Sequence, residues 1–254
     1  MRKWGTVLCI GLAACSQGDV DLPQNAVVST SLCADGYVHA FPELEPRLAA
    51  LSWQSKSALS ATPEHLKALP QTDSEPERAL IWKNATQISS SGGSGDIDLD
   101  WGESLETVWV NLARLSEDLN LPDPSRNLKA RLNSLPPLTS SPKILYLDRS
   151  GATAGPNTFV DEVIRAAGAI NVVDTPGWQS PDIERLIQYK PDIILTSFMD
   201  SNYSGINDRA LRHDALATKI DSLPQIQIPG KYWPCAGPGL IDATEHLSKS
   251  LLAL

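Results

Sequence analysis

The fold class follows from the stretch SPDIERLIQYKPDIILT, residues 180–196. Its first residues, Ser180-Pro181-Asp182, begin a helix that we expect to run through Tyr189. Pro191 ends that helix, and the apolar run that follows, through Thr196, is a strand. A helix that turns directly into an apolar strand is typical of parallel sheets with crossover helices.

The same alternation of strands and helices extends outward through the second half of the chain. A strand at Lys143–Leu147 precedes a helix whose apolar face recurs from Phe159 to Ala167, with Gly168 at its end. A further strand is expected at Gln225–Ile228 and a terminal helix at Gly239–Leu252.

The first half repeats this pattern less regularly. Its longest periodic element is an amphipathic helix at Ser104–Leu119, in which Trp109 belongs to the apolar stripe and is read as a core residue. The strands are expected at 26–30, 47–51, 86–89 and 96–100, and the other helices at 31–41 and 62–69.

Prolines separate the two halves. Pro122 and Pro124 precede a connecting helix at 126–135, and a second proline-rich stretch, 136–142, follows it. The sequence therefore predicts an α/β protein with two lobes of mostly parallel sheet and crossover helices, joined by a single bridging helix. The expected boundaries are an N-terminal lobe at 26–120, the bridging helix and linker at 121–142, and a C-terminal lobe at 143–254.

The N-terminal end has the features of a lipoprotein signal. Arg2 and Lys3 precede a short apolar run that ends in Leu12-Ala13-Ala14-Cys15, and this run is too short to span a bilayer. Residues 1–14 are read as a signal peptide, Cys15 as the acylated mature N-terminus and 15–25 as a tether. An ordinary signal peptide cleaved nearby is the alternative. Which membrane holds the anchor is left open between inner and outer.

Charge argues against nucleic acid as a partner. The chain has 30 acidic and 21 basic residues, a net charge of -9, and no cluster of lysine or arginine that would follow a phosphate backbone. An acidic surface supports solubility and suits a basic partner.

No motif in the sequence indicates catalysis or a bound cofactor. Gly92–Asp96 is not a G-x-S-x-G elbow, and the glycine-rich segment 90–95 lacks the lysine of a phosphate-binding loop. The four histidines lie in or beside expected helices instead of at strand ends, where open α/β sheets bind ligands. We therefore expect no enzyme, no cofactor and no metal site.

Tryptophan is used unusually often, with seven residues against three phenylalanines. Trp53 and Trp233 follow expected strands, where flat indoles suit a large ligand with apolar or π surface. Loop packing is the alternative for both, and it is the preferred reading for Trp178.

The stretch GATAGPNTFVDEVI at 151–164, continuing through AAGAINVV at 166–173, is the clearest of several that match one family in order. It resembles the second-lobe signature of the cobalamin- and iron-complex-binding periplasmic proteins of ABC importers. Residues 29–35, 51–53, 180–195 and 233–238 match further strands and cleft loops of that family. The resemblance implies a receptor that binds a corrinoid, a ferric siderophore or haem between its lobes and delivers it to a permease in the inner membrane.

The resemblance also implies a cleft built from loops of both lobes. Trp53 and Trp233 would stack on the ligand, Arg149 would meet a carboxylate or phosphate, or else pair with Asp148 or another acid, and small polar residues would bind polar edges. The cleft is expected to contain Ser31, Leu32, Cys33, Trp53, Gln54, Arg149, Gly151, Ala152, Thr153 and Trp233.

Cys33 and Cys235 fall in opposite cleft loops of that family, so the resemblance implies a disulfide between them. Two buried thiols, or a soft ligand pair for cobalt or iron, are the alternatives. The first lobe is shorter than the family pattern, with a crossover helix missing at 90–95, and the bridging helix is short. These departures leave a second reading, an envelope scaffold or sensor lipoprotein that uses the same fold without transport.

Overall fold

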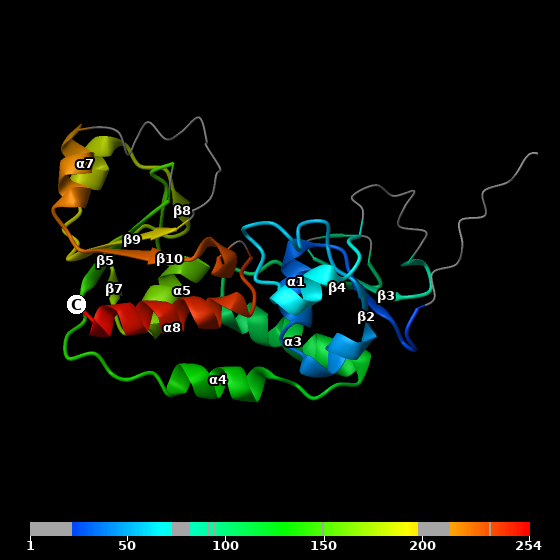
Figure 1. Ribbon diagram of the computed structural model, residues 1–254. Coiled ribbons are helices and arrows are strands. Elements are labelled where there is room, and N and C mark those ends of the chain that lie inside the picture. The colour runs from blue at the N-terminus through cyan, green and yellow to red at the C-terminus, as the bar shows by residue number, and fades with distance from the viewer. Residues whose placement is uncertain are drawn as a thin grey trace, which may run out of the picture.

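The computed structural model describes residues 22–72, 82–90, 92–93, 95–148, 150–197, 214–233 and 235–254. The expected signal peptide, Cys15 and Arg149 lie outside these ranges. Figure 1 shows two α/β units side by side, with the segment that carries α4 along one side of both. The predicted α/β class, with two lobes of mostly parallel sheet, is confirmed.

The N-terminal lobe is built on a four-stranded parallel sheet in the order β2-β1-β3-β4. Its central strand β1 is buried on both faces, which explains its apolar run. The strands are β1 Val27–Ser29, β2 Leu48–Ala50, β3 Thr86–Ser90 and β4 Ile97–Leu99.

The helices of this lobe begin where the sequence places capping residues. Ser31 caps α1 at Leu32–Val38, and Ser104 caps α3 at Leu105–Leu119, each through its side-chain oxygen. The helix expected at 62–69 is instead a short 3-10 helix, η2 at Glu64–Ala68. A second 3-10 helix, η1 at Pro42–Arg47, contains the Pro46 that interrupts α-helical hydrogen bonding.

The described residues of the connection between β3 and β4, 92–93 and 95–96, form no helix. Two of its backbone N–H groups, those of Gly92 and Gly93, donate to the carboxylate of Asp98. A Cβ at Gly93 would lie 2.6 Å from the Cβ of Ser89, so the tight return of the chain needs glycine there. Because Asp98 already satisfies these N–H groups, the loop is not a cradle for phosphate.

The C-terminal lobe has a four-stranded parallel sheet in the order β10-β9-β5-β7 and a separate antiparallel pair, β6 with β8. The sequence did not predict β6, β7, β8 or α7. The strands are β5 Lys143–Leu147, β6 Thr153–Ala154, β7 Ile170–Asn171, β8 Trp178–Gln179, β9 Ile193–Ser197 and β10 Gln225–Ile228; the helices are α5 Phe159–Ala166, α6 Ile183–Gln188, α7 Asp214–Asp221, η5 Gly230–Tyr232 and α8 Gly239–Leu252.

A single nine-residue helix, α4 at Ser125–Asn133, lies in the connection between the lobes. Arg131 on α4 forms ion pairs with Asp242 and Glu245 of α8, with N–O distances of 2.6 and 2.7 Å. The connecting segment is therefore fastened to the terminal helix of the C-terminal lobe (Figure 1). Among the described helices, none is long and apolar enough to cross a bilayer.

Candidate functional site

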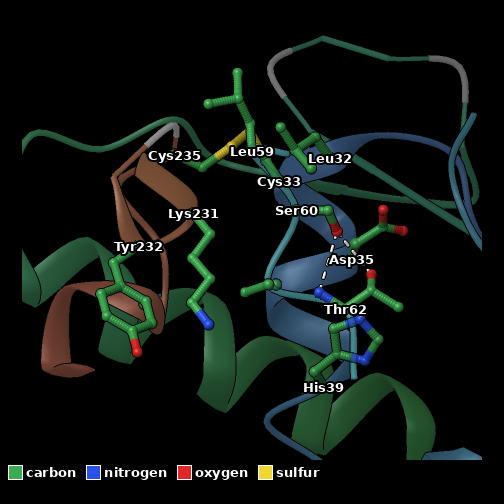
Figure 2. A pocket seen from close by; sticks show the side chains of 13 residues that line it. Leu32, Cys33, Asp35, His39, Leu59, Ser60, Thr62, Lys231, Tyr232 and Cys235 are labelled. Atoms are coloured by element: carbon green, nitrogen blue, oxygen red, sulfur yellow. Dashed lines mark hydrogen bonds between the residues drawn. A yellow bond between two sulfur atoms is a disulfide. The ribbon is translucent and has the colours of Figure 1, made fainter. Parts of the chain in front are cut away.

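A pocket lies between the lobes, where α1 faces η5 and the start of α8 (Figure 2). Its cavity volume is about 40 Å³, and it opens to solvent. The N-terminal lobe contributes α1 and the loop before η2, and the C-terminal lobe contributes η5 and the loop before α8. Its lining residues are Leu32, Cys33, Asp35, Gly36, His39, Leu59, Ser60, Ala61, Thr62, Lys231, Tyr232, Cys235 and Gly239.

One wall of this interlobe pocket is the disulfide between Cys33 and Cys235. The Cα atoms are 5.3 Å apart, and the two residues are separated by 202 positions in the sequence. Both cysteines are partly exposed and line the pocket. The predicted pairing is therefore confirmed, and it joins α1 of one lobe to the loop before α8 of the other.

Burial shifts the pKa of two side chains that line the pocket, Asp35 and His39. Burial is the main cause that raises the pKa of the Asp35 carboxyl, although it accepts hydrogen bonds from the backbone N–H and hydroxyl of Ser52. Burial also lowers the pKa of His39 to about 4, so this imidazole is neutral at pH 7. The Nε2 of His39 lies 3.1 Å from the hydroxyl of Thr62.

The loop that carries Trp53 is fixed from two sides. Asp35 holds the preceding residue, Ser52, and the side-chain amide of Gln71 donates to the carbonyl of Trp53 at 2.7 Å. The Trp53 side chain is nevertheless 55% exposed at the carboxyl end of β2. A rigid backbone thus presents an exposed indole beside a half-buried Gln54.

The residues at the start of α1 are partly exposed, as a contact surface requires. The hydroxyl of Ser31 accepts from the N–H of Ala34 and lies 2.8 Å from the hydroxyl of Ser90 at the end of β3. Leu32 and Cys33 follow at the lip of the interlobe pocket. These three predicted residues are together in space.

The loop after β5 was expected to line the cleft through Gly151, Ala152 and Thr153, but most of it is buried. Gly151 and Thr153 are buried, and the Thr153 hydroxyl donates to the backbone carbonyl of Tyr146 at 2.6 Å. That bond directs the hydroxyl into the lobe. Asp148 organises the turn by accepting from the N–H of Ala152, which is half-exposed.

Trp233 also differs from the expectation, because it is a core residue and only 1% exposed. Its indole N–H donates to the hydroxyl of Tyr146 at 3.2 Å, and its ring packs edge-on against Phe159 with centroids 5.4 Å apart. The loop position that suggested a ligand contact is turned inward by this hydrogen bond and this packing. Trp233 therefore supports the site from beneath and does not line it.

The sequence interpretation missed two tryptophans at the junction of the lobes. Trp101 follows β4 and is 49% exposed, and Trp178 lies in β8 and is 44% exposed. Both indole N–H groups donate to the carboxylate of Glu103. The position of Trp101 directly after a strand was a usable signal, whereas Trp178 is placed by the pairing of β8 with β6, each only two residues long.

Comparison with solved structures relates this architecture to known proteins. The periplasmic haem-binding protein RhuT from Roseiflexus sp. RS-1 is 19% identical, with a TM-score of 0.68 over 90% of this chain and 98% of that one. The periplasmic haem-binding protein HutB of Vibrio cholerae is 17% identical, with a TM-score of 0.68 over 90% and 99%. The chain has the fold of the periplasmic solute-binding proteins.

The periplasmic vitamin B12-binding protein BtuF of Vibrio cholerae shares this fold, at 16% identity and a TM-score of 0.59 over 90% of this chain and 97% of that one. These neighbours are binding proteins, not enzymes. No protein-family profile matches the chain, and no curated protein matches it in sequence.

The chemistry of the described residues also fits binding better than catalysis. Within the described ranges, no group of three or more histidine, cysteine, aspartate or glutamate side chains is arranged to hold a metal ion. The exposed groups at the strand ends are indoles, an amide and hydroxyls, which bind apolar faces and polar edges.

Proposed function

We propose that the chain is a periplasmic receptor of an ABC importer that captures a corrinoid, haem or a ferric siderophore at the junction of its lobes. One observation carries this proposal: the indoles of Trp101 and Trp178, one from each lobe, meet at Glu103 and are 49% and 44% exposed, and Trp53 after β2 is 55% exposed. Exposed aromatic groups at one edge of a fold are typical of a surface that binds a large apolar or π-rich ligand. The fold shared with haem- and B12-binding proteins supports the ligand class.

Polar groups nearby suit the edges of such a ligand. We assign this role to Ser31 and Gln54, with Leu32 and Ala152 as apolar contacts. Arg149 is proposed to meet a carboxylate or phosphate of the ligand. Trp233 and Thr153 act by holding Tyr146 and the loop after β5 in place.

The proposed compartment is extracytoplasmic, with residues 1–14 as a signal peptide, Cys15 as the lipid attachment site and 15–25 as a tether. The disulfide Cys33–Cys235 supports an oxidising compartment. A permease in the inner membrane is the proposed partner, because a receptor of this kind delivers its ligand there. The net charge of -9 suits a basic docking surface on that partner.

A second function, an envelope scaffold or sensor lipoprotein without transport, is favoured by a different observation. The disulfide ties the lobes together beside a pocket with a cavity volume of only about 40 Å³. Ligand sites for drug-sized molecules span roughly 300–1,000 Å³, and a corrinoid is larger than such molecules. On this alternative the exposed indoles contact a protein partner.

Calorimetric titration of the folded protein with haem, cobalamin and a ferric siderophore tests the proposal. The receptor function predicts saturable binding of one of them, weakened by about 1 to 3 kcal/mol in Trp53→Ala and in Trp178→Ala. Trp109→Phe is the matched control, because that indole packs on α3 against Lys129, away from the strand ends. Absence of binding to the whole panel would favour the scaffold.

A further inference from the structure

We infer that Glu103 is a positioning residue that sets the spacing of the two exposed indoles, Trp101 from the N-terminal lobe and Trp178 from the C-terminal lobe. The inference deepens the proposed function and rests on it in one respect, namely that these indoles contact the ligand. The arrangement of the three side chains itself does not depend on any ligand.

The carboxylate of Glu103 lies between the two indole N–H groups. Its Oε1 accepts from Nε1 of Trp101 at 3.5 Å, and both of its oxygens lie 3.3 Å from Nε1 of Trp178. An indole N–H is a donor only, and an ionised carboxylate is an acceptor with several lone pairs, so one carboxylate can serve both rings. The two indoles are therefore held edge-on toward a common point.

The ring of Trp178 is fixed on its inner side by buried aromatic residues. Its centroid lies 5.3 Å from that of Phe159 and 6.3 Å from that of Tyr146, both in edge-on arrangements. Phe159 and Tyr146 are buried, which anchors this ring to the core of the C-terminal lobe. Glu103 supplies the remaining contact, at the outer edge of the ring.

The backbone around Trp101 is fixed by the start of α3. A Cβ at Gly102 would lie 2.2 Å from the Cβ of Thr107, so glycine is needed for the chain to approach the first turn this closely. Ser104 then caps the helix by accepting from the N–H of Thr107. Glu103, between Gly102 and Ser104, consequently has little freedom to move its backbone.

A second hydrogen bond crosses between the lobes at the same place. The N–H of Leu105, at the beginning of α3, donates to the carboxylate of Glu162 on α5 at 2.7 Å. Residues 103–105 are thus in contact with the C-terminal lobe through a side chain and a backbone group. This fixes the distance across which Glu103 reaches Trp178.

The placement of a negative carboxylate beside the indoles also orients a ligand. A planar ligand that lies against these rings would direct any carboxylates of its own away from Glu103, because like charges repel. Glu103 therefore affects both the spacing of the aromatic surface and the direction in which a haem-like ligand lies on it.

The first test uses ligand-free protein and the ¹⁵N–¹H resonances of the indole Nε1 groups, assigned with single Trp→Phe variants. In Glu103→Ala, the signals of Trp101 and Trp178 both shift, while those of Trp53 and Trp109 stay in place. Glu103→Gln retains one oxygen acceptor and moves both signals less. Unchanged signals of Trp101 and Trp178 in folded Glu103→Ala would overturn the inference.

The second test is haem binding by the same variants, with Glu106→Ala as the matched control because Glu106 is an exposed acidic residue in the first turn of α3, three residues after Glu103. Glu103→Ala is expected to weaken haem binding about three- to tenfold, with Glu103→Gln between it and wild type. Equal haem affinity in wild type and Glu103→Ala would contradict the positioning role. If the indole signals shift in Glu103→Ala but wild type does not bind haem, the contacts of Glu103 with the two indoles are supported and haem is rejected as the ligand.

Discussion

Cys33 on α1 and Cys235 before α8 form a disulfide that joins the two lobes, with their Cα atoms 5.3 Å apart. Next to it, the Tyr37 hydroxyl donates to the carbonyl of Ala236 at 3.3 Å, again from one lobe to the other. The bond therefore restrains the opening of the interlobe pocket, and we expect little hinge motion between the lobes.

The first prediction concerns this bond. Unreduced, denatured mature protein is expected to contain no titratable thiol from Cys33 or Cys235. The double variant Cys33→Ser, Cys235→Ser should lose about 4 to 5 kcal/mol of unfolding free energy, because the bond closes a long loop in the unfolded chain. Urea denaturation measures the loss. Two reactive thiols in the unreduced wild type would rule the disulfide out.

Trp233 and Trp53 are predicted to differ in what their substitution affects. Trp233→Ala removes a buried side chain and should cost about 3 to 5 kcal/mol of stability. Trp53→Ala removes an exposed side chain and should cost less than about 0.5 kcal/mol while weakening ligand binding. Thermal or urea unfolding of both variants measures the contrast. Equal stability losses would contradict the burial of one ring and the exposure of the other.

Asp35 gives a prediction for pH dependence. Its pKa in the folded protein is raised above the ordinary 3.8, so folding disfavours the ionised form. Its contribution to stability therefore falls as the pH rises through 3.8 toward the folded pKa, and Asp35→Asn lacks this fall. We expect urea unfolding from about pH 3.5 to about pH 8 to show that the free energy of unfolding of Asp35→Asn rises relative to that of wild type as the pH increases. A free energy of unfolding of Asp35→Asn that falls relative to wild type as the pH increases would contradict the raised pKa.

The lipid anchor gives a fourth prediction. Cys15→Ala should abolish labelling of the protein with radioactive fatty acid and leave a precursor that keeps its signal peptide. Stable attachment is expected because mature lipoproteins carry more than one acyl chain, whereas a single chain binds a membrane only marginally. Ser16→Ala is the control and should keep the label. Label that persists on Cys15→Ala would place the attachment elsewhere.

The fold could be predicted from the sequence because the signals for its strands, helices and linkers are local. Apolar strands, capping serines such as Ser31 and Ser104, and prolines at 122–142 each act on their own segment. The pairing of Cys33 with Cys235 was reached only through the family resemblance. The short strands β6 and β8 were missed because two residues carry no periodicity.

The candidate site was harder to predict because exposure is decided by tertiary contacts. Trp233 and Trp53 both follow strands, yet the hydroxyl of Tyr146 draws one indole into the core while the other remains at the surface. Trp178 was read as loop packing, and its contact with Glu103 depends on how the two lobes meet. Neither fact is encoded in the spacing of nearby residues.

The central claim is that the junction of the lobes holds a large ligand. Native mass spectrometry of the protein purified from its own envelope tests it most directly. The expected result is one corrinoid, haem or ferric siderophore per chain, retained by wild type and reduced in a Trp53→Ala, Trp178→Ala double variant purified in parallel. The claim would be contradicted if repeated preparations of wild type show no bound ligand and the protein binds none of these compounds when they are added.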